Sequence, residues 1–547
     1  MPSLTLAPVF ARLALVLLVL APLGAPAAQD GDDLFAVRKN FGLFADLYAA
    51  LAGEYVDPVD AEALMRTGIA AMTETLDPYT VFFDEATTTE GRLRQSGEVG
   101  GAGLVVARRG GVLVVTGLDE NGPAERQGVR VGDRVTRLAG REAEGIDDAA
   151  AQELLRGEPG STLDLEVERE GEGGVISFVL VRAEGDSRDV TAATFLAEGV
   201  GYIRLEQFLF TSAAEVRAGI DSLRSQGELN ALVLDLRGNP GGLLEQAVEI
   251  FGLFVPRGTP VVSTRGRTAG TVRGYSTRDE PIAPDLPLAV LVDPVSASAS
   301  EIVAGAVQDY DRGVVVGETT FGKGLVQIVR PMPYGTALKL TVSRYYTPSG
   351  RSIQSVAYRQ GETDRDVAER PTFETTNGRT VRGGGGIEPD EDVGLGPVSD
   401  LEAALVRAAK FLRFANRFRA ETPTLPNDFA IDDDLLRDFR QFAEAEGLEY
   451  RTEAEREADA LATALTEAGY DAASDELAAL RRAVEAEKSR DFERHAPRLA
   501  ARLRQEILSR YLDQTNLAQT LLDGDPTVER ALEVLGDGRR YREILGG

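Results

Sequence analysis

Short apolar strands alternate with amphipathic helices through the middle of this 547-residue chain, and this alternation restricts its fold more than any other feature. An apolar strand is predicted over Pro287–Val292, a helix over Glu301–Tyr310 and a second strand over Val314–Val316. The same pattern occurs upstream, with a strand over Val200–Leu209, a helix over Ala213–Gln226 and a strand over Ala231–Leu236. Strands and helices in this order pack as layers, so the sequence predicts an α/β layered core.

Ser298 lies at the turn between the strand Pro287–Val292 and the helix that follows it, among other small residues. The first amide groups of a helix have no partner within the helix, and the helix dipole is positive there. A hydroxyl at this turn is therefore close to groups that stabilise an oxyanion. The alternative interpretation is that Ser296, Ser298 and Ser300 only cap the helix.

A serine nucleophile needs a base, and the chain has a single histidine, His495, in a charged helical stretch near its C-terminus. Lysine can replace histidine where burial lowers its pKa towards neutrality. Lys323 lies between two glycines that allow close approach. If residues 324–330 are extended, alternation places Gln327 on the same face as Lys323, within reach of its amine. The sequence therefore favours a Ser298/Lys323 site.

A phosphate-binding loop is the competing interpretation of this segment, because Gly317, Gly322 and Lys323 match most of a Walker A pattern. Gly324 stands where the pattern needs Ser or Thr, and the residues after it predict a strand instead of a helix. Nucleotide binding is therefore disfavoured.

A second glycine-rich turn, 238–242, follows the strand Ala231–Leu236. Such a turn exposes backbone N–H groups, as an oxyanion hole requires, although it would equally suit a phosphate. Its pairing with Ser298 favours the oxyanion hole. Asp235 and Arg237, which flank the end of the strand, are interpreted as a structural ion pair.

Composition excludes several classes of function. The chain carries 88 acidic and 59 basic residues, a net charge of −29, which argues against a nucleic-acid partner. It has no cysteine and one histidine, so a thiolate metal site is ruled out and a zinc site is disfavoured. We expect no metal or cofactor.

The N-terminal residues predict an export signal. Arg12 precedes the apolar run Leu13–Leu23, and Ala25-Pro26-Ala27 offers a cleavage site. The expected location is the periplasm. The alternative is a protein anchored in the membrane by an uncleaved N-terminal segment.

Helical patterns occupy both ends of the mature chain. Apolar residues recur at helical spacing within 31–85, with a second helix from about Ala61 to Leu76. From Asp400 onward the chain is predicted to be almost wholly helical, beginning with an amphipathic helix over Leu401–Phe414. This C-terminal region was open to three interpretations: dimerisation, cover for the active site, or a docking site for a partner.

Five sequence blocks, in order, resemble the C-terminal processing (tail-specific) proteases, S41-type serine peptidases with a Ser/Lys dyad and a PDZ domain. The blocks are LVLDLRGNPGG at 232–242, SASASEIVAGAVQD, VVGETTFGKGLVQ, YYTPSGRSIQ at 345–354 and GIEPD at 386–390. The resemblance implies Ser298 as nucleophile, Lys323 as general base and Gln327 as the residue that orients the lysine. It implies backbone amides of Gly242 and Ala299 as the oxyanion hole.

The resemblance also implies a fold and its parts. The expected fold is a crotonase-like layered α/β protease core with an inserted PDZ β-domain, an N-terminal helical element and a C-terminal all-α region. The expected boundaries are a signal peptide at 1–28, a helical region at 29–95, a PDZ domain at 96–185, the protease core at 186–395 and the helical domain at 396–547. The stretch GPAERQGVRVGDRVTRLAG and the glycine turns around it carry the likeness to a PDZ domain.

A PDZ domain binds a peptide C-terminus as an added strand, with loop amides holding the carboxylate. The resemblance assigns that loop to Gly101, Ala102, Gly103 and Leu104. The expected function is an exported serine endopeptidase whose partners are proteins or peptides with free C-termini, with a homodimer or an adaptor protein as a further partner. The alternatives are a non-catalytic peptide-binding protein on the same fold and an acyl-transfer enzyme of crotonase type.

Overall fold

The computed structural model describes residues 31–84, 100–119, 121–183, 189–354, 370–394, 396, 398–426, 429–470, 473–512 and 514–547. The predicted export signal lies outside the described residues. The chain divides into two compact units, Met1–Phe82 and Phe83–Gly547. Within the described ranges, no helix has both the length and the apolar character needed to cross a bilayer.

The first unit contains two helices, α2 (Gly31–Glu54) and α3 (Ala61–Glu74). Helix α3 begins after Asp60, whose side chain accepts hydrogen bonds from two amides of the first turn. No residue of α3 is buried, and α2 leaves several large apolar side chains exposed. The N-terminal helical element predicted from the sequence is therefore present.

The second unit begins with a small β-domain whose sheet has the order β3-β4-β5-β8-β9, with β6 paired to β5. Its strands and helices are β2 (Gly100–Gly101), β3 (Leu104–Arg109), β4 (Val112–Leu118), α5 (Pro123–Gln127), β5 (Arg134–Leu138), β6 (Arg141–Glu142), η1 (Ala143–Gly145), α6 (Asp148–Leu155), β7 (Arg156–Gly157), β8 (Thr162–Glu168) and β9 (Val175–Val181). The sheet and α6 enclose a separate apolar core.

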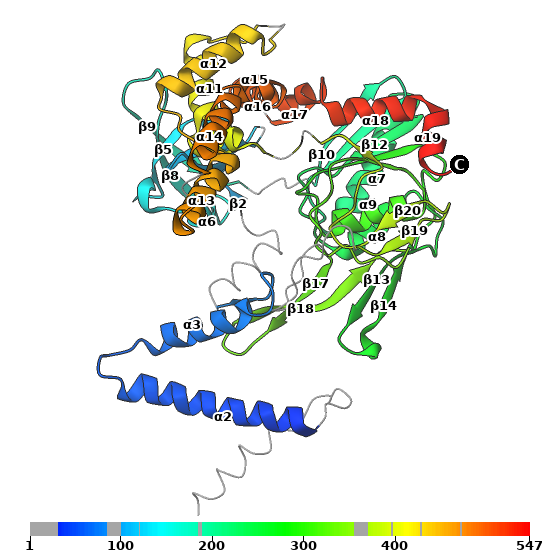
Figure 1. The fold of residues 1–547 in the computed structure, drawn as a ribbon. Helices are drawn as coiled ribbons and strands as arrows, with labels where there is room; N and C mark the ends of the chain where they lie inside the picture. Colours follow the sequence, from blue (N-terminus) through cyan, green and yellow to red (C-terminus); the bar gives the residue numbers. More distant parts are fainter. Residues whose placement is uncertain are drawn as a thin grey trace, which may run out of the picture. The chain divides into compact units, whose positions relative to one another are not determined.

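The α/β core is built on a six-stranded sheet with the order β10-β11-β12-β15-β16-β21. Figure 1 shows helices α7, α8 and α9 beside this sheet. All neighbours are parallel except β10 and β11. The elements are β10 (Val190–Ala197), β11 (Val200–Leu205), α7 (Ser212–Gln226), β12 (Ala231–Asp235), α8 (Leu244–Gly252), β15 (Leu288–Val292), α9 (Ala299–Asp309), β16 (Val314–Gly317) and β21 (Glu391–Asp392).

Helices cover both faces of this sheet. Because side chains alternate along a strand, neighbouring residues contact the helices on opposite faces. Leu232 and Leu234 of β12 belong to the apolar cluster that includes α7, α8 and α9. Val233, between them, belongs to the cluster on the other face, with residues of helix α18 (Pro526–Gly536). A strand buried on both faces reads as a near-continuous apolar run, as β15 does throughout and β12 does up to Leu234, before Asp235.

A second sheet contains β13 (Pro260–Gly266), β14 (Arg273–Ser276), β17 (Leu325–Pro331) and β18 (Ala337–Tyr346), all paired antiparallel. Lys323 lies just before β17. The strand at β17 is the one predicted from the sequence, so the helix that a Walker A loop requires is absent at this position.

The C-terminal region is helical, as predicted. Its helices are α10 (Asp400–Arg407), α11 (Lys410–Glu421), α12 (Asp433–Ala445), α13 (Glu453–Glu467), α14 (Ser474–Lys488), α15 (Asp491–Arg494), α16 (Ala496–Leu508), α17 (Gln514–Leu522), α18 and α19 (Gly538–Ile544). The single helix predicted over Leu401–Phe414 is wrong, because the chain turns at Ala409, which has a φ of 52°. Ala409 and Leu412 pack there against Val114 of the small β-domain, and this packing overrides the helical pattern.

Candidate active site

Ser298 occupies the turn between β15 and α9 and has a backbone conformation that side chains rarely adopt. Its φ is 57° and its ψ is −110°, and it is the residue directly before the first helical residue, Ala299. Strained non-glycine residues of this kind cluster at functional sites. Ser298 is half-buried at the start of the helix.

The two neighbouring serines have structural roles, which separates them from Ser298. The buried Ser296 hydroxyl donates to the backbone oxygen of Leu236 at 2.8 Å, and the buried Ser300 hydroxyl donates to that of Asn239 at 2.9 Å. Both serines therefore fasten the β15–α9 turn to the glycine-rich turn 238–242. Ser298 instead occupies the N-cap position of α9, where it forms a capping box with Glu301.

Glu301, in the first turn of α9, joins the two segments that carry Ser298 and Lys323. One oxygen of its buried carboxylate accepts the backbone N–H groups of Ser298 and Lys323, each at 2.8 Å. The other accepts the Gly322 N–H at 2.7 Å and the Thr320 hydroxyl at 2.6 Å. Burial raises the pKa of Glu301, and these four hydrogen bonds oppose the rise.

Tyr345 of β18 makes a second link between the same segments. Its hydroxyl donates to the backbone oxygen of Lys323 and lies 3.2 Å from the backbone oxygen of Ser298. The structure thus holds the backbones of Ser298 and Lys323 close together through two connections. The sequence analysis missed both Glu301 and Tyr345, although Ser298 and Glu301 have the S-x-x-E spacing of a capping box, a signal that identifies Glu301.

Lys323 is half-buried, and its surroundings favour the neutral amine. Desolvation lowers the pKa of Lys323 below its ordinary value, and the nearby positive charge of Lys339 lowers it further. The carboxylate of Glu301 acts in the opposite direction. A lysine with a lowered pKa is suited to accept a proton from a hydroxyl.

Gln327 lies in β17, where its amide nitrogen is 3.3 Å from the hydroxyl of Thr341, to which it donates. The pairing of β17 with β18 shifts register between Val326 and Gln327. The residue left unpaired at this shift is Val342 of β18, and Lys323 lies before the first residue of β17, so strand alternation does not extend to Lys323. The role of Gln327 in orienting Lys323 stays a prediction.

The glycine-rich turn after β12 lies directly against Ser298. A Cβ atom on Gly241 would lie 2.8 Å from the Ala299 backbone nitrogen, and one on Gly242 would lie 2.1 Å from the backbone oxygen of Phe208. Within the described part of the chain, the amides of Gly242 and Ala299 donate to no protein group. Two unused N–H groups beside a hydroxyl are the elements of an oxyanion hole.

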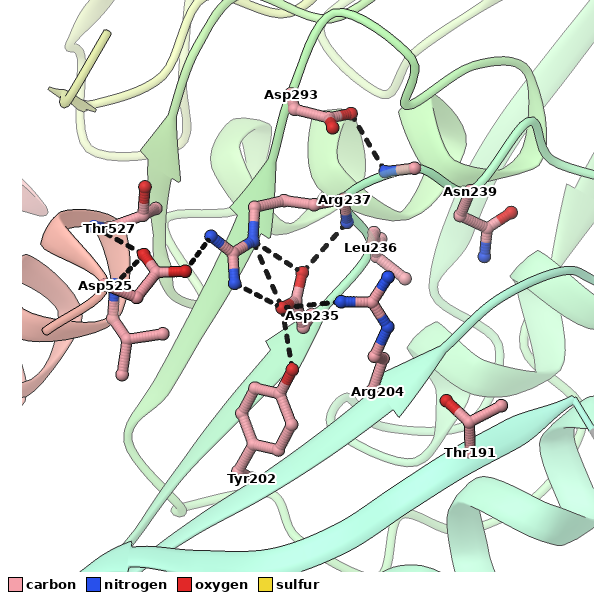
Figure 2. A network of polar contacts seen from close by, with 12 residues as sticks. Thr191, Tyr202, Arg204, Asp235, Leu236, Arg237, Asn239, Asp293, Asp525 and Thr527 are labelled. Carbon is pink, nitrogen blue, oxygen red and sulfur yellow. Dashed lines mark hydrogen bonds and ion pairs between the residues drawn. The ribbon is translucent and has the colours of Figure 1, made fainter. Parts of the chain in front are cut away.

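A network of ion pairs and hydrogen bonds holds the start of the glycine-rich turn, where it leaves β12 (Figure 2). The predicted pair is present: Arg237 donates to the fully buried carboxylate of Asp235 at 2.7 Å. Arg237 also pairs at 2.7 Å with Asp525, which caps α18. The arginines Arg237 and Arg204 lower the pKa of Asp235 against the desolvation that would raise it.

The predicted carboxylate loop of the small β-domain is already partly engaged by the chain itself. The Gly101 amide donates to the backbone oxygen of Ala183 at 2.9 Å, and the Ala102 amide donates to that of Leu155 at 3.2 Å. Gly103 has a φ of 74°, and a Cβ atom there would lie 2.6 Å from Pro123, so only glycine fits.

Known families match three parts of the chain. Residues 199–361 match peptidase family S41, residues 114–169 match a PDZ domain, and residues 401–535 match the C-terminal helical domain of probable PDZ-proteases. The carboxy-terminal-processing protease of Bartonella bacilliformis is 35% identical over 347 residues, which cover 63% of this chain and 78% of that protein. The chain belongs to the S41 carboxy-terminal processing peptidases.

One further relative of this S41 peptidase and one solved structure are also similar to the chain. Carboxy-terminal processing protease CtpB of Bacillus subtilis is 34% identical over 309 residues, covering 56% of this chain and 64% of that protein. A solved structure of a photosystem II D1 C-terminal processing protease has 28% identity and a TM-score of 0.39, covering 64% of this chain and 92% of that one. The PDZ match confirms the inserted PDZ β-domain, and the S41 match falls on the α/β layers that carry Ser298.

Proposed function

We propose that this S41 peptidase is an exported serine endopeptidase that recognises protein C-terminal tails through its PDZ domain and cleaves with a Ser298/Lys323 dyad. The observation that carries the proposal is the shared carboxylate of Glu301, which accepts the backbone N–H groups of both residues. The lowered pKa of Lys323 supports it, because a general base must be unprotonated to act.

The reaction needs only groups of this chain. Neutral Lys323 takes the hydroxyl proton of Ser298 as the oxygen attacks the scissile carbonyl carbon, and the carbonyl electron pair moves to its oxygen. The Ala299 and Gly242 N–H groups then stabilise that oxyanion, a contribution worth about 3 kcal/mol for one donor in a comparable site. The lysine ammonium protonates the departing amine as the C–N bond breaks. Lys323 next takes a proton from the water that attacks the acyl carbonyl carbon, and it returns that proton to the Ser298 oxygen as the ester C–O bond breaks.

Export and tail recognition have separate support. The apolar run and the A-x-A sequence near the N-terminus predict export to the periplasm, with membrane anchoring by an uncleaved segment as the alternative. Relatives are named for processing of carboxy termini. The PDZ domain gives a peptide end a strand to pair with, which a small thioester substrate would not need.

Two single substitutions test the dyad. Ser298→Ala and Lys323→Ala should each reduce kcat by about a thousandfold or more while the thermal unfolding midpoint stays near that of the wild type. The substrate is a synthetic peptide of thirty residues with a free C-terminal carboxylate, and mass spectrometry identifies its products. The same peptide amidated at its C-terminus should be cleaved more slowly.

Three results would contradict the proposal. Cleavage by either variant at the wild-type rate would refute the dyad. Saturable peptide binding by the wild type without any product would favour the non-catalytic binding protein. Equal cleavage of the free-acid and amidated peptides would show that the enzyme does not recognise the C-terminal carboxylate.

A further inference from the structure

Strand β3 is at the edge of the PDZ sheet, and one of its two sides pairs with β4. Backbone groups of alternate residues in a strand point to opposite edges. The Val106 oxygen and the Arg108 N–H are both bonded by side chains of α6, so these two residues direct their backbone groups to the edge away from β4. This is the edge at which an additional strand would pair.

Helix α6 occupies that edge along its length. The Gln152 side-chain amide donates to the Val106 oxygen at 2.9 Å, and the Asp148 carboxylate accepts the Arg108 N–H at 2.7 Å. At the end nearer the carboxylate loop, the Leu155 oxygen accepts the Ala102 N–H at 3.2 Å. Asp148, Gln152 and Leu155 are spaced by four and three residues, so they lie on one face of the helix.

Two arginines hold the backbone at the ends of α6 in place. The guanidinium of Arg108 donates to the carbonyl oxygens of the turn that precedes the helix, at Ala143, Glu144 and Ile146. The guanidinium of Arg182 donates to the Leu154 and Leu155 oxygens at the end of the helix. With the helix backbone held at both ends, the side chains of Asp148 and Gln152 are the parts that can move by a change of rotamer.

We propose that Gln152 and Asp148 form a latch that closes the peptide edge of the PDZ domain. A C-terminal tail pairs with β3 only after its backbone N–H replaces Gln152 at the Val106 oxygen and its backbone oxygen replaces Asp148 at the Arg108 N–H. The inference rests on the proposed tail recognition and assigns the residues that regulate it. The buried side chains beside this edge, Leu104, Val106, Ala151 and Leu155, suit a tail whose last residues are apolar.

The latch weakens tail binding because each hydrogen bond that the tail makes to β3 replaces one that the domain already has. When a substitution removes one latch side chain, the Val106 oxygen or the Arg108 N–H loses its protein partner. The hydrogen bond that the tail makes there then adds its whole free energy to binding. The net value of one such bond corresponds to about threefold to tenfold in affinity.

The test uses the full chain carrying Ser298→Ala, so that the probe is not cleaved. The probe is a fluorescein-labelled decapeptide that ends in alanine, leucine and valine with a free carboxylate, and fluorescence anisotropy gives its Kd. Gln152→Ala should lower Kd by about threefold to tenfold. Asp148→Ala should act in the same direction, whereas Asp148→Asn keeps an acceptor oxygen and should bind like its parent. Glu153→Ala, an exposed residue of the same helix, is the matched control.

The outcomes separate the latch from tail recognition. If Gln152→Ala and Asp148→Ala bind the free-acid probe no tighter than their parent, and the parent rejects the amidated probe, the latch is wrong and tail recognition stands. If neither the parent nor the latch variants bind, or all bind acid and amide equally, both ideas are wrong. Tighter, carboxylate-dependent binding by both alanine variants supports the latch.

Discussion

Lys323 illustrates how a single side chain acquires its chemistry from neighbours that are distant in sequence. Burial and Lys339 lower the pKa of Lys323, while Glu301 raises it. A general base acts in its neutral form, so the rate of proteolysis should rise with pH through the pKa of Lys323. The lowered pKa places that rise below the ordinary lysine value of 10.5.

Replacement of Lys339 should move this pH profile. Lys339→Gln removes a positive charge that disfavours the ammonium form of Lys323, so the pKa of Lys323 rises and the midpoint of kcat/KM against pH moves to higher pH. At pH values below that midpoint the variant is slower than the wild type. Arg330→Gln, which removes an exposed cation of β17, is the control and should leave the midpoint unchanged. A midpoint that stays put or moves to lower pH in Lys339→Gln would contradict the prediction.

Glu301 is expected to position the dyad without contacting substrate. Glu301→Gln replaces one acceptor oxygen by an NH₂ group. In the variant this NH₂ group faces N–H or O–H groups that donate to the carboxylate in the wild type, so donors face donors. Stability should fall by about 1–3 kcal/mol and kcat by about a hundredfold, with KM little changed. Urea unfolding and steady-state kinetics measure the two effects. The control Glu529→Gln, in the first turn of α18, should change neither stability nor kcat. If Glu301→Gln keeps the wild-type kcat, Glu301 does not position the dyad.

Sequence reasoning reached the residues whose chemistry is intrinsic and missed those whose role is geometric. Ser298 and Lys323 stand out because a hydroxyl at the start of a helix and a lysine between glycines can be recognised from the sequence alone. Glu301 acts through four donors from two segments, Ser298 and residues 320–323. Tyr345 comes from a strand of the second sheet. Gln327 was placed by an alternation that would have to include Lys323, which lies before the first residue of β17.

At the scale of elements, the two turns of the candidate site are the loops at the carboxyl ends of two neighbouring parallel strands. Strand β12 leads into the glycine turn and β15 leads into Ser298, so their adjacency brings the turns together. The sequence predicted both strands and the α/β core from apolar runs. It did not predict that α18 would cover the second face, because an amphipathic helix does not identify the surface that it packs against.

Asp525 connects α18 to the glycine turn, and its contribution to stability is separable from simple helix capping. Asp525→Ala removes both the cap and the Arg237 ion pair, whereas Asp537→Ala removes only the cap of α19. We expect a loss of about 2–3 kcal/mol of unfolding free energy for the first and about 1 kcal/mol for the second. Urea denaturation of the two variants measures the difference. Equal losses would show that the Arg237–Asp525 pair adds nothing.

At the scale of the molecule, the C-terminal helical region contacts both other parts of the second unit. The Asn416 side chain of α11 donates to the Gly132 oxygen of the PDZ domain at 3.0 Å, and Arg510 holds that side chain at 2.8 Å. A Cβ atom on Gly132 would collide with Asn416, so the contact depends on glycine there. Helix α18 meanwhile completes the protease core. These contacts show that the helical region packs within the chain. Dimerisation, cover for the active site and docking of a partner stay predictions.

Exposed apolar side chains on α2 are where we propose that a second copy of the chain binds. The Phe35 and Phe41 side chains of α2 are 71% and 74% exposed, together with Val37, Leu43 and Leu47. Exposed apolar surface of this extent on one helix marks an interaction site. Phe35→Ser combined with Phe41→Ser should weaken self-association by about tenfold or more, measured by sedimentation equilibrium. Lys39→Ser, on the same helix, should leave it unchanged. A wild-type chain that stays monomeric at every concentration, or a double variant that associates as tightly, would assign this surface to a different partner.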